Sequence, residues 1–250
     1  MSRVAQIIWQ TVGVVLLAGM LVAAVVWGYT MRPSGEPCGA LTYRILDADK
    51  RMYLSENELD SLLRKDDVYP VGKRVDRVDL ARIEAVIRRH PMVERAECYM
   101  TPLFEVRVDL RQRVPLLLVK TPIERYYIDT HHRVLPWREQ IKDEVLVVSG
   151  AVGPQAACNG LAEMAEWLQN EPYWRERIHH IHMRTPLMAV AFVQQGEGAK
   201  EIEVVLGPLN DYERKMNKLR VFMENGAEAI QGKQYRELDV RYRGQVIGRQ

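Results

Sequence analysis

The sequence lacks an excess of charge of either sign. Its 35 Lys and Arg side chains nearly balance 33 Asp and Glu side chains, which leaves a formal net charge of +2 over 250 residues. Proteins that bind nucleic acid usually carry a basic stripe that neutralises phosphate groups. This composition gives no reason to expect such a stripe, and we therefore predict no nucleic-acid partner.

Cysteine is equally scarce. The chain has only Cys38, Cys98 and Cys158, an odd number with no CxxC pair. In an oxidising compartment, one disulfide between Cys38 and Cys98 would leave one free thiol. Alternatively, all three cysteines are unpaired and behave as small apolar residues. The sequence leaves both alternatives open.

The motifs of common enzyme classes are missing as well. The serines that follow the first 33 residues are Ser34, Ser55, Ser61 and Ser149. None of them lies in a GxSxG context, and no glycine-rich phosphate loop follows a predicted strand and opens a helix. We therefore expect no catalytic residues, no cofactor and no small-molecule substrate, and we predict that the protein is not an enzyme.

One histidine cluster could form a catalytic metal site and therefore bears on the prediction that the protein is not an enzyme. In the segment His179-His180-Ile181-His182, a strand would place His180 and His182 on one face, where they could share a metal with a third ligand. No HExxH motif and no acidic or cysteine partner at ligand spacing accompanies them. The simpler interpretation is a polar face of a strand, with Ile178 and Ile181 toward the core, so we predict no metal site.

Only one long uncharged run occurs, from Val4 to Met31. A helix over residues 11–29 would be about 28 Å long, close to the ~30 Å hydrocarbon core of a bilayer. Trp9 precedes it, and Trp27 and Tyr29 lie near its end, where amphipathic rings prefer the headgroup level. A cleaved signal peptide fits less well, because the apolar run exceeds the usual ~7–15 residues.

This run predicts a single-pass protein of the inner (plasma) membrane, held to the lipid by its N-terminal helix. We expect residues 1–10 to form a cytoplasmic tail, residues 11–29 the transmembrane helix and residues 30–39 a linker. The bulk of the chain would then lie in the periplasmic or extracytoplasmic space, since a short tail precedes the span and a large mass follows it.

The rest of the chain predicts an α+β protein with two domains. Residues 40–113 have the pattern strand–helix–helix–strand–strand, and residues 114–250 indicate a mostly antiparallel sheet with flanking helices. The first helix has a complete start signal, because Ser55 can cap it and Glu58 can reach back to the cap. The segment Arg236–Ile247 is typical of a terminal strand or hairpin.

Several motifs, in order, resemble the FtsQ/DivIB cell-division family, whose members carry a POTRA domain. The first group of motifs is Ile83-Glu84, Ile87, His90-Pro91, Val93 and Ala96. The second group is Arg113-Val114-Pro115, Tyr127-Ile128-Asp129 and Val134-Leu135-Pro136. The last group is Leu206-Gly207, Tyr212, Lys215, Leu219 and Leu238-Asp239-Val240-Arg241-Tyr242. The chain departs from the pattern at His132, which stands where the family has glycine. The turn there must therefore use a non-glycine conformation.

The resemblance implies a bitopic scaffold of the divisome that acts in septum formation. It would bind FtsB-like and FtsL-like single-span proteins and link early and late division components. In the family, the principal FtsB contact includes an Arg-Tyr pair on the last strands. This carries over to Arg241 and Tyr242, with Gly244, Gln245 and Val246 as neighbours.

Physical chemistry agrees with that placement, because an edge strand offers unpaired backbone groups to a partner segment. Arg and Tyr are also enriched at binding hot spots. The alternative is that Tyr242 belongs to the core and that Arg241 is a solvated edge charge.

Two other functions remain as alternatives. The first is a membrane-tethered POTRA chaperone or transport adaptor, because such modules also capture strands in outer-membrane assembly. The second is a zinc-dependent periplasmic hydrolase that would use His180 and His182.

Overall fold

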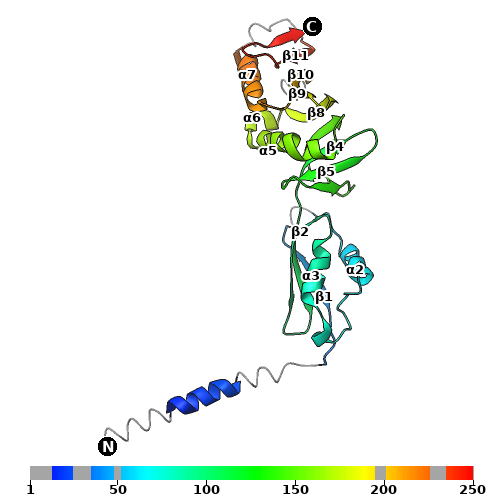
Figure 1. The fold of residues 1–250 in the computed structure, drawn as a ribbon, viewed down its shortest axis with the longest axis vertical. Helices are drawn as coiled ribbons and strands as arrows, with labels where there is room; N and C mark the ends of the chain where they lie inside the picture. The colour runs from blue at the N-terminus through cyan, green and yellow to red at the C-terminus, as the bar shows by residue number, and fades with distance from the viewer. Residues whose placement is uncertain (1–12, 25–34, 48–51, 195–200, 226–234, 250) are drawn as a thin grey trace, which may run out of the picture. The chain divides into compact units, whose positions relative to one another are not determined.

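The protein is described by a computed structural model (Figure 1). The described residues are 13–24, 35–47, 52–194, 201–225 and 235–249. The chain divides into two compact units. One unit comprises Met1–Arg44, Asp60–Ile87 and Glu97–Asp109, and the other comprises Ile45–Leu59, Arg88–Ala96 and Leu110–Gln250.

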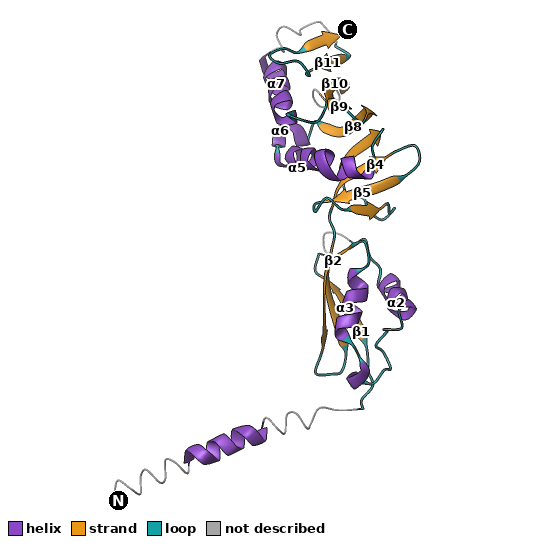
Figure 2. Cartoon of the chain, in the orientation of Figure 1, coloured by secondary structure: helices purple, strands orange, loops and turns teal. Residues whose placement is uncertain are grey.

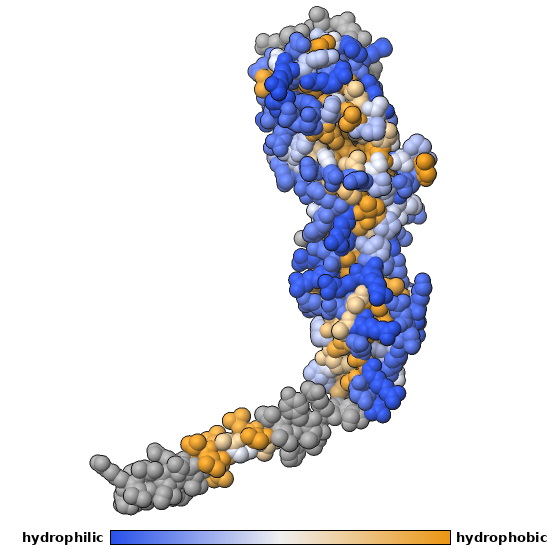
Figure 3. Space-filling model, viewed as in Figure 1, coloured by the Kyte–Doolittle hydropathy of each residue, from blue (hydrophilic) through white to orange (hydrophobic). Residues whose placement is uncertain are grey.

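The N-terminal helix is described over residues 13–24 and is apolar along its length (Figure 3). Within the described part of the chain, no helix has both the length and the apolar character that a membrane crossing requires. The predicted span over residues 11–29 includes residues 11–12 and 25–29, which lie outside the described residues, as does the predicted tail. The membrane span therefore stays a prediction.

A three-stranded sheet with strand order β1-β3-β2 forms the first part of the fold (Figure 2). Its strands are β1 (Leu41–Ile45), β2 (Val93–Met100) and β3 (Val106–Gln112). Between β1 and β2 the chain forms α2 (Glu56–Lys65), the 3-10 helix η1 (Val75–Arg77) and α3 (Leu80–Arg88). The predicted order β-α-α-β-β is confirmed. The helices are amphipathic, and Ile83, Val86 and Ile87 of α3 are buried.

The start of α2 follows the sequence prediction only in part. The Glu58 backbone N–H donates to Ser55 Oγ at 3.3 Å, so the serine cap is present. The Glu58 carboxylate, however, accepts hydrogen bonds of 2.6 and 2.9 Å from Arg138, and it lies 3.1 Å from His90 Nε2. A guanidinium offers a stronger, bidentate partner than a backbone amide, which explains why the predicted return contact of Glu58 was wrong.

This cluster shifts two pKa values within the second compact unit. Hydrogen bonds from Arg138 lower the pKa of Glu58 to about 2, against a smaller opposing effect of burial. Burial lowers the pKa of His90, and its contact with Glu58 only partly compensates. The pair therefore combines an ionised carboxylate with an imidazole that favours the neutral form.

A nine-stranded sheet forms the second part of the fold, with the order β12-β11-β10-β9-β8-β7-β4-β5-β6. The strands are β4 (Pro115–Lys120), β5 (Arg125–Asp129), β6 (Val134–Pro136), β7 (Leu146–Gly150), β8 (Ile178–Thr185), β9 (Met188–Gln194), β10 (Glu201–Gly207), β11 (Glu237–Asp239) and β12 (Ile247–Arg249). Neighbouring strands are parallel at β4–β7, β7–β8 and β10–β11 and antiparallel elsewhere. The predicted mostly antiparallel sheet is confirmed.

Helices cover one face of this sheet. They are α4 (Pro154–Ala156), the π-helix η2 (Ala157–Leu161), α5 (Ala162–Asn170), α6 (Pro172–Arg175) and α7 (Tyr212–Asn225). Leu168 of α5 and Leu219 of α7 belong to the same buried cluster as Ile181 and Met183 of β8. Since side chains alternate along a strand, the even-numbered His180 and His182 lie on the opposite face.

The turn between β5 and β6 is organised by a buried carboxylate. Asp129 is fully buried and accepts hydrogen bonds from the backbone N–H groups of His131 and Arg133, at 2.9 and 2.7 Å. Arg113 Nη1 adds an ion pair at 2.8 Å. His132 completes the turn with a φ of 57°, which is the left-handed conformation. The turn therefore does use a non-glycine residue where the family pattern has glycine.

Replacing His132 with glycine is expected to stabilise the protein. A left-handed conformation costs a non-glycine residue roughly 1–2 kcal/mol, and the added entropy of glycine in the unfolded chain offsets part of the gain. The contact of His132 with Glu166, at 3.5 Å, is half-exposed and contributes little. We expect His132→Gly to raise the unfolding free energy by up to about 1 kcal/mol, measured by urea denaturation.

The neighbouring histidine provides the matched control. His131 is in the same turn but is not among the residues with positive φ. His131→Gly should therefore lower stability or leave it unchanged, because glycine gains no conformational advantage there. Equal effects of the two substitutions would show that backbone strain at His132 is not what limits stability.

All three cysteines are free thiols in this structure, so the Cys38–Cys98 disulfide is not formed. Cys38 is buried, and its Sγ lies 3.4 Å from the carbonyl oxygen of Ala40. Burial, with a smaller contribution from Glu84, raises the pKa of Cys98 to about 12. A thiol with such a pKa stays protonated and is a poor nucleophile.

Candidate partner-binding site

The predicted binding residues lie at one end of the nine-stranded sheet. β11 pairs in parallel with β10, and β12 folds back antiparallel onto β11, with Glu237 opposite Arg249 and Asp239 opposite Ile247. Arg241 to Val246 form the connection between β11 and β12 rather than part of a strand. The expected hairpin is therefore present, but the five predicted binding residues occupy its turn, because the chain must reverse there before β12 can pair.

Arg241 is held by a buried carboxylate. Asp239 is only 2% exposed, and it accepts hydrogen bonds from Arg241 Nη2 at 2.6 Å and from Arg241 Nε at 3.0 Å. The Arg241 backbone N–H donates to the same carboxylate at 3.1 Å. Burial alone would raise the pKa of Asp239, but these hydrogen bonds lower it below its ordinary value. The guanidinium is thus fixed in position by Asp239, the last residue of the strand that precedes the turn.

A glycine allows this close packing. Gly207 at the end of β10 has a φ of 69°, and a Cβ at that position would lie 2.8 Å from Arg241 Cδ. No side chain fits at this distance without displacing Arg241. Gly207 therefore permits the backbone bend after β10 and leaves room for the side chain of Arg241.

A lysine from α7 ties the turn to the helix layer. Lys218 Nζ donates to the carbonyl oxygen of Val240 at 2.8 Å and also to that of Tyr242. Burial is the main cause that lowers the pKa of Lys218. Sequence reasoning missed both Lys218 and Asp239 as parts of this site, because their roles depend on contacts between α7, β11 and the turn. Asp239 could have been indicated by its position two residues before Arg241, but Lys218 is 24 positions from Tyr242 and no sequence signal points to it.

The other predicted residues differ in exposure. Tyr242 is 47% exposed, and the guanidinium carbon of Arg241 lies 5.6 Å from the centre of its ring. Gly244 has a φ of 74° and makes the tight turn, and Gln245 beside it is exposed. Val246 points inward against the core cluster. Tyr242 and Gln245 are therefore the members of the predicted set that can meet a partner directly.

β12 itself is an edge strand. Within the described part of the chain no strand pairs with its outer side, and its three residues are exposed. The strand is fixed to its neighbour by an ion pair of 2.9 Å between Arg249 and Glu237. Tyr235 lies over Gly248 so closely that a Cβ there would be 2.4 Å from the ring. The result is a short edge strand with an exposed tyrosine in the turn that leads to it, an arrangement suited to a partner strand.

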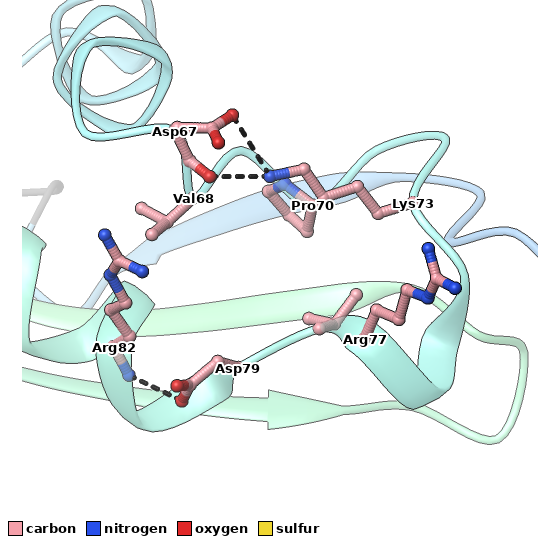
Figure 4. A pocket seen from close by; sticks show the side chains of 8 residues that line it. Asp67, Val68, Pro70, Lys73, Arg77, Asp79 and Arg82 are labelled. Carbon is pink, nitrogen blue, oxygen red and sulfur yellow. Dashed lines mark hydrogen bonds and ion pairs between the residues drawn. The ribbon is translucent and has the colours of Figure 1, made fainter.

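The first compact unit contains a small hollow (Figure 4). It is lined by Asp67, Val68, Pro70, Lys73, Arg77, Val78, Asp79 and Arg82. Lys73 donates to the Asp67 carbonyl oxygen at 2.6 Å, and Asp79 caps α3 by accepting from the Arg82 backbone N–H at 2.9 Å. Lys73 and Asp79 are thus already engaged within the domain, which is typical of a structural loop.

The histidine cluster is arranged as the sequence predicted, with one addition. His180 and His182 share a face of β8, and Ser149 of β7 lies within hydrogen-bond distance of both rings. Among the described residues, no group of three or more His, Cys, Asp and Glu side chains is arranged to hold a metal ion. Sequence reasoning missed the serine, because only the pairing of β7 with β8 brings it there.

Comparisons with known proteins agree with the fold. A family model described as "FtsQ/DivIB, C-terminal related" matches residues 114–249, which are 136 of the 250 residues. A model of a POTRA-like domain matches residues 36–111. No curated protein matches the sequence.

Among solved structures, one match is the major extracytoplasmic domain of the trans isomer of the bacterial cell division protein DivIB from Geobacillus stearothermophilus. The two sequences are 14% identical, and the match covers 46% of this chain and 95% of that chain, with a TM-score of 0.29.

Proposed function

The chain belongs to the FtsQ/DivIB, C-terminal related family, and on this premise we propose that it is a scaffold of the cell-division machinery. The family is typically non-enzymatic and is associated with cell division. The finer proposal is that the C-terminal part binds FtsB-like and FtsL-like single-span proteins and so links early and late components of the divisome.

One observation supports the binding role more than any other, namely the edge at β12. A short strand with a free outer side can accept a partner segment as an additional strand, and the backbone hydrogen bonds then supply affinity. Tyr242 stands beside this edge with nearly half of its surface exposed. An exposed tyrosine offers rigid amphipathic area and is a frequent hot spot.

Arg241 contributes to the same proposal in a different way. Because Asp239 holds its guanidinium, we propose that Arg241 positions the turn and Tyr242, rather than forming the main ion pair with a partner. The remaining members of the predicted set, Gly244, Gln245 and Val246, would then set the shape of the turn and contribute contacts at its rim.

We further propose that the N-terminal segment anchors the protein in the inner membrane, with the bulk of the chain outside the cytoplasm. A shared membrane confines this protein and other single-span proteins to two dimensions. Such confinement raises the effective concentration of each partner and permits a modest interface to suffice.

The proposal is tested by following a functional fluorescent fusion of the full chain in dividing cells. Depletion of the protein should block septation, and the fusion should gather at the division site. A diffuse membrane signal, together with normal septation after depletion, would contradict the proposal. Association with unfolded outer-membrane precursors instead of division proteins would favour a POTRA chaperone or transport adaptor.

A further inference from the structure

Two histidine rings of β8 converge on a single serine of the neighbouring strand. The parallel pairing of β7 with β8 places Ser149 opposite His182. Ser149 Oγ lies 2.8 Å from His180 Nε2 and 2.9 Å from His182 Nδ1. These three residues belong to the second compact unit, and nothing in the proposed division role uses them.

The number of protons makes this convergence notable. A serine hydroxyl has one proton to donate, so it can satisfy the lone pair of only one imidazole nitrogen. The second ring must either donate its own N–H to the oxygen or leave a lone pair facing it. The two ring nitrogens and the hydroxyl oxygen therefore face one common point. A metal ion can bind at such a point, with the nitrogens as ligands and the oxygen as a further donor.

The rings are also held in place. The His180 ring stacks on Phe192 of β9, with the ring centres 4.8 Å apart and an angle of 8° between the planes. Gly150 leaves room for the second ring, because a Cβ at this position would lie 2.9 Å from His182 Cε1. Such support reduces the side-chain entropy that a ligand would otherwise have to remove.

Contrary to the prediction from the sequence, which did not include the serine, we propose that Ser149, His180 and His182 form a binding site for one divalent transition-metal ion. The two ring nitrogens would be the ligands, and the serine hydroxyl would be a third donor or would orient bound water. Two imidazoles and a neutral oxygen suit Cu²⁺, Ni²⁺ or Zn²⁺, whereas Mg²⁺ and Ca²⁺ prefer sets of oxygen ligands. Such an ion would tie β7 to β8 on the face of the sheet opposite the helices.

The test uses the full chain, purified in detergent, stripped with a chelator and titrated with Cu²⁺ alone. We expect one ion per chain, with an electron paramagnetic resonance spectrum that shows coupling to two nitrogens. His180→Gln and His182→Gln should each weaken binding about tenfold or more. Ser149→Ala should weaken it less, because both nitrogens remain.

The matched control is His179→Gln, since His179 belongs to the same motif but is exposed and is not hydrogen-bonded to Ser149. This variant should bind Cu²⁺ as the original chain does. Near-ultraviolet circular dichroism shows whether each variant is folded. Failure of the original chain to bind one ion would overturn the proposal without any variant. Equal binding by the His180→Gln/His182→Gln double variant would overturn it too, because it would show adventitious binding elsewhere.

Discussion

Replacing Tyr242 with alanine is expected to weaken binding of an FtsB-like partner by about tenfold or more while the protein stays folded. Truncation of a central aromatic residue commonly costs a complex at least ~1.4 kcal/mol, which corresponds to that factor. The side chain is 47% exposed, so its removal leaves no large cavity in the core. The measurement is the dissociation constant of the complex between this protein and the extracytoplasmic part of the partner.

A tyrosine of the first compact unit serves as the control. Tyr99 at the end of β2 is 38% exposed, and Tyr99→Ala removes a similar side chain from a strand outside the nine-stranded sheet. This variant should bind the partner as the original chain does. If Tyr242→Ala binds equally well and has a native circular dichroism spectrum, Tyr242 is not part of the interface.

Arg241 is a less suitable position for this test, for a reason that the structure supplies. Its loss would leave the buried Asp239 carboxylate without its main partner, and an uncompensated buried charge destabilises the fold. Weaker partner binding by Arg241→Glu could then result from a distorted turn rather than from a lost contact. Tyr242 separates the two effects.

Replacing Asp129 with alanine is expected to cause the largest loss of stability, about 3–5 kcal/mol. Asp129 is fully buried, pairs with Arg113 at 2.8 Å and holds two backbone N–H groups of its turn. Its removal leaves the nearly buried Arg113 cation and both N–H groups without this acceptor. Chemical denaturation followed by near-ultraviolet circular dichroism measures the loss.

An exposed ion pair provides the comparison. Glu224 pairs with Arg220 at 2.8 Å on the surface of α7, and Glu224→Ala should change the unfolding free energy by less than about 1 kcal/mol. A similarly small effect of Asp129→Ala would mean that the turn reorganises around the substitution. It would also mean that Asp129 does not hold the turn between β5 and β6 together.

Much of the secondary structure could be predicted because it depends on local patterns. An apolar run bounded by turns, such as the one that forms β9 from Met188 to Gln194, is a local signal of a strand. β6 and β12 have three residues each, which is too few positions to show alternation along the chain. β6 exists because the longer β5 pairs with it, and β12 exists because it folds back onto β11.

The candidate binding site and the histidine cluster were also predictable only where local patterns define them. The sequence identified Arg241 and Tyr242 through motifs that resemble a family, and it placed His180 and His182 on one face of a strand through simple alternation. It could not identify Asp239 as the partner of Arg241 or Lys218 as the support of the turn. Asp239 and Arg241 are two residues apart, but their contact needs the space that Gly207 of β10 leaves for the arginine side chain. The contact of Lys218 depends on how α7 meets the turn, and no short-range pattern encodes that meeting.

The sequence by itself determined the α+β class, the order of the main elements and the family, because periodicity, turn residues and ordered motifs are properties of neighbouring residues along the chain. Only the tertiary structure decided the partners of the polar side chains. Glu58 contacts Arg138, Lys218 contacts the carbonyl oxygen of Val240, and Ser149 contacts two histidines. Strand register and helix packing bring these residues together across 22 positions or more, as between Lys218 and Val240. Both are fixed by burial of the whole core rather than by any local segment.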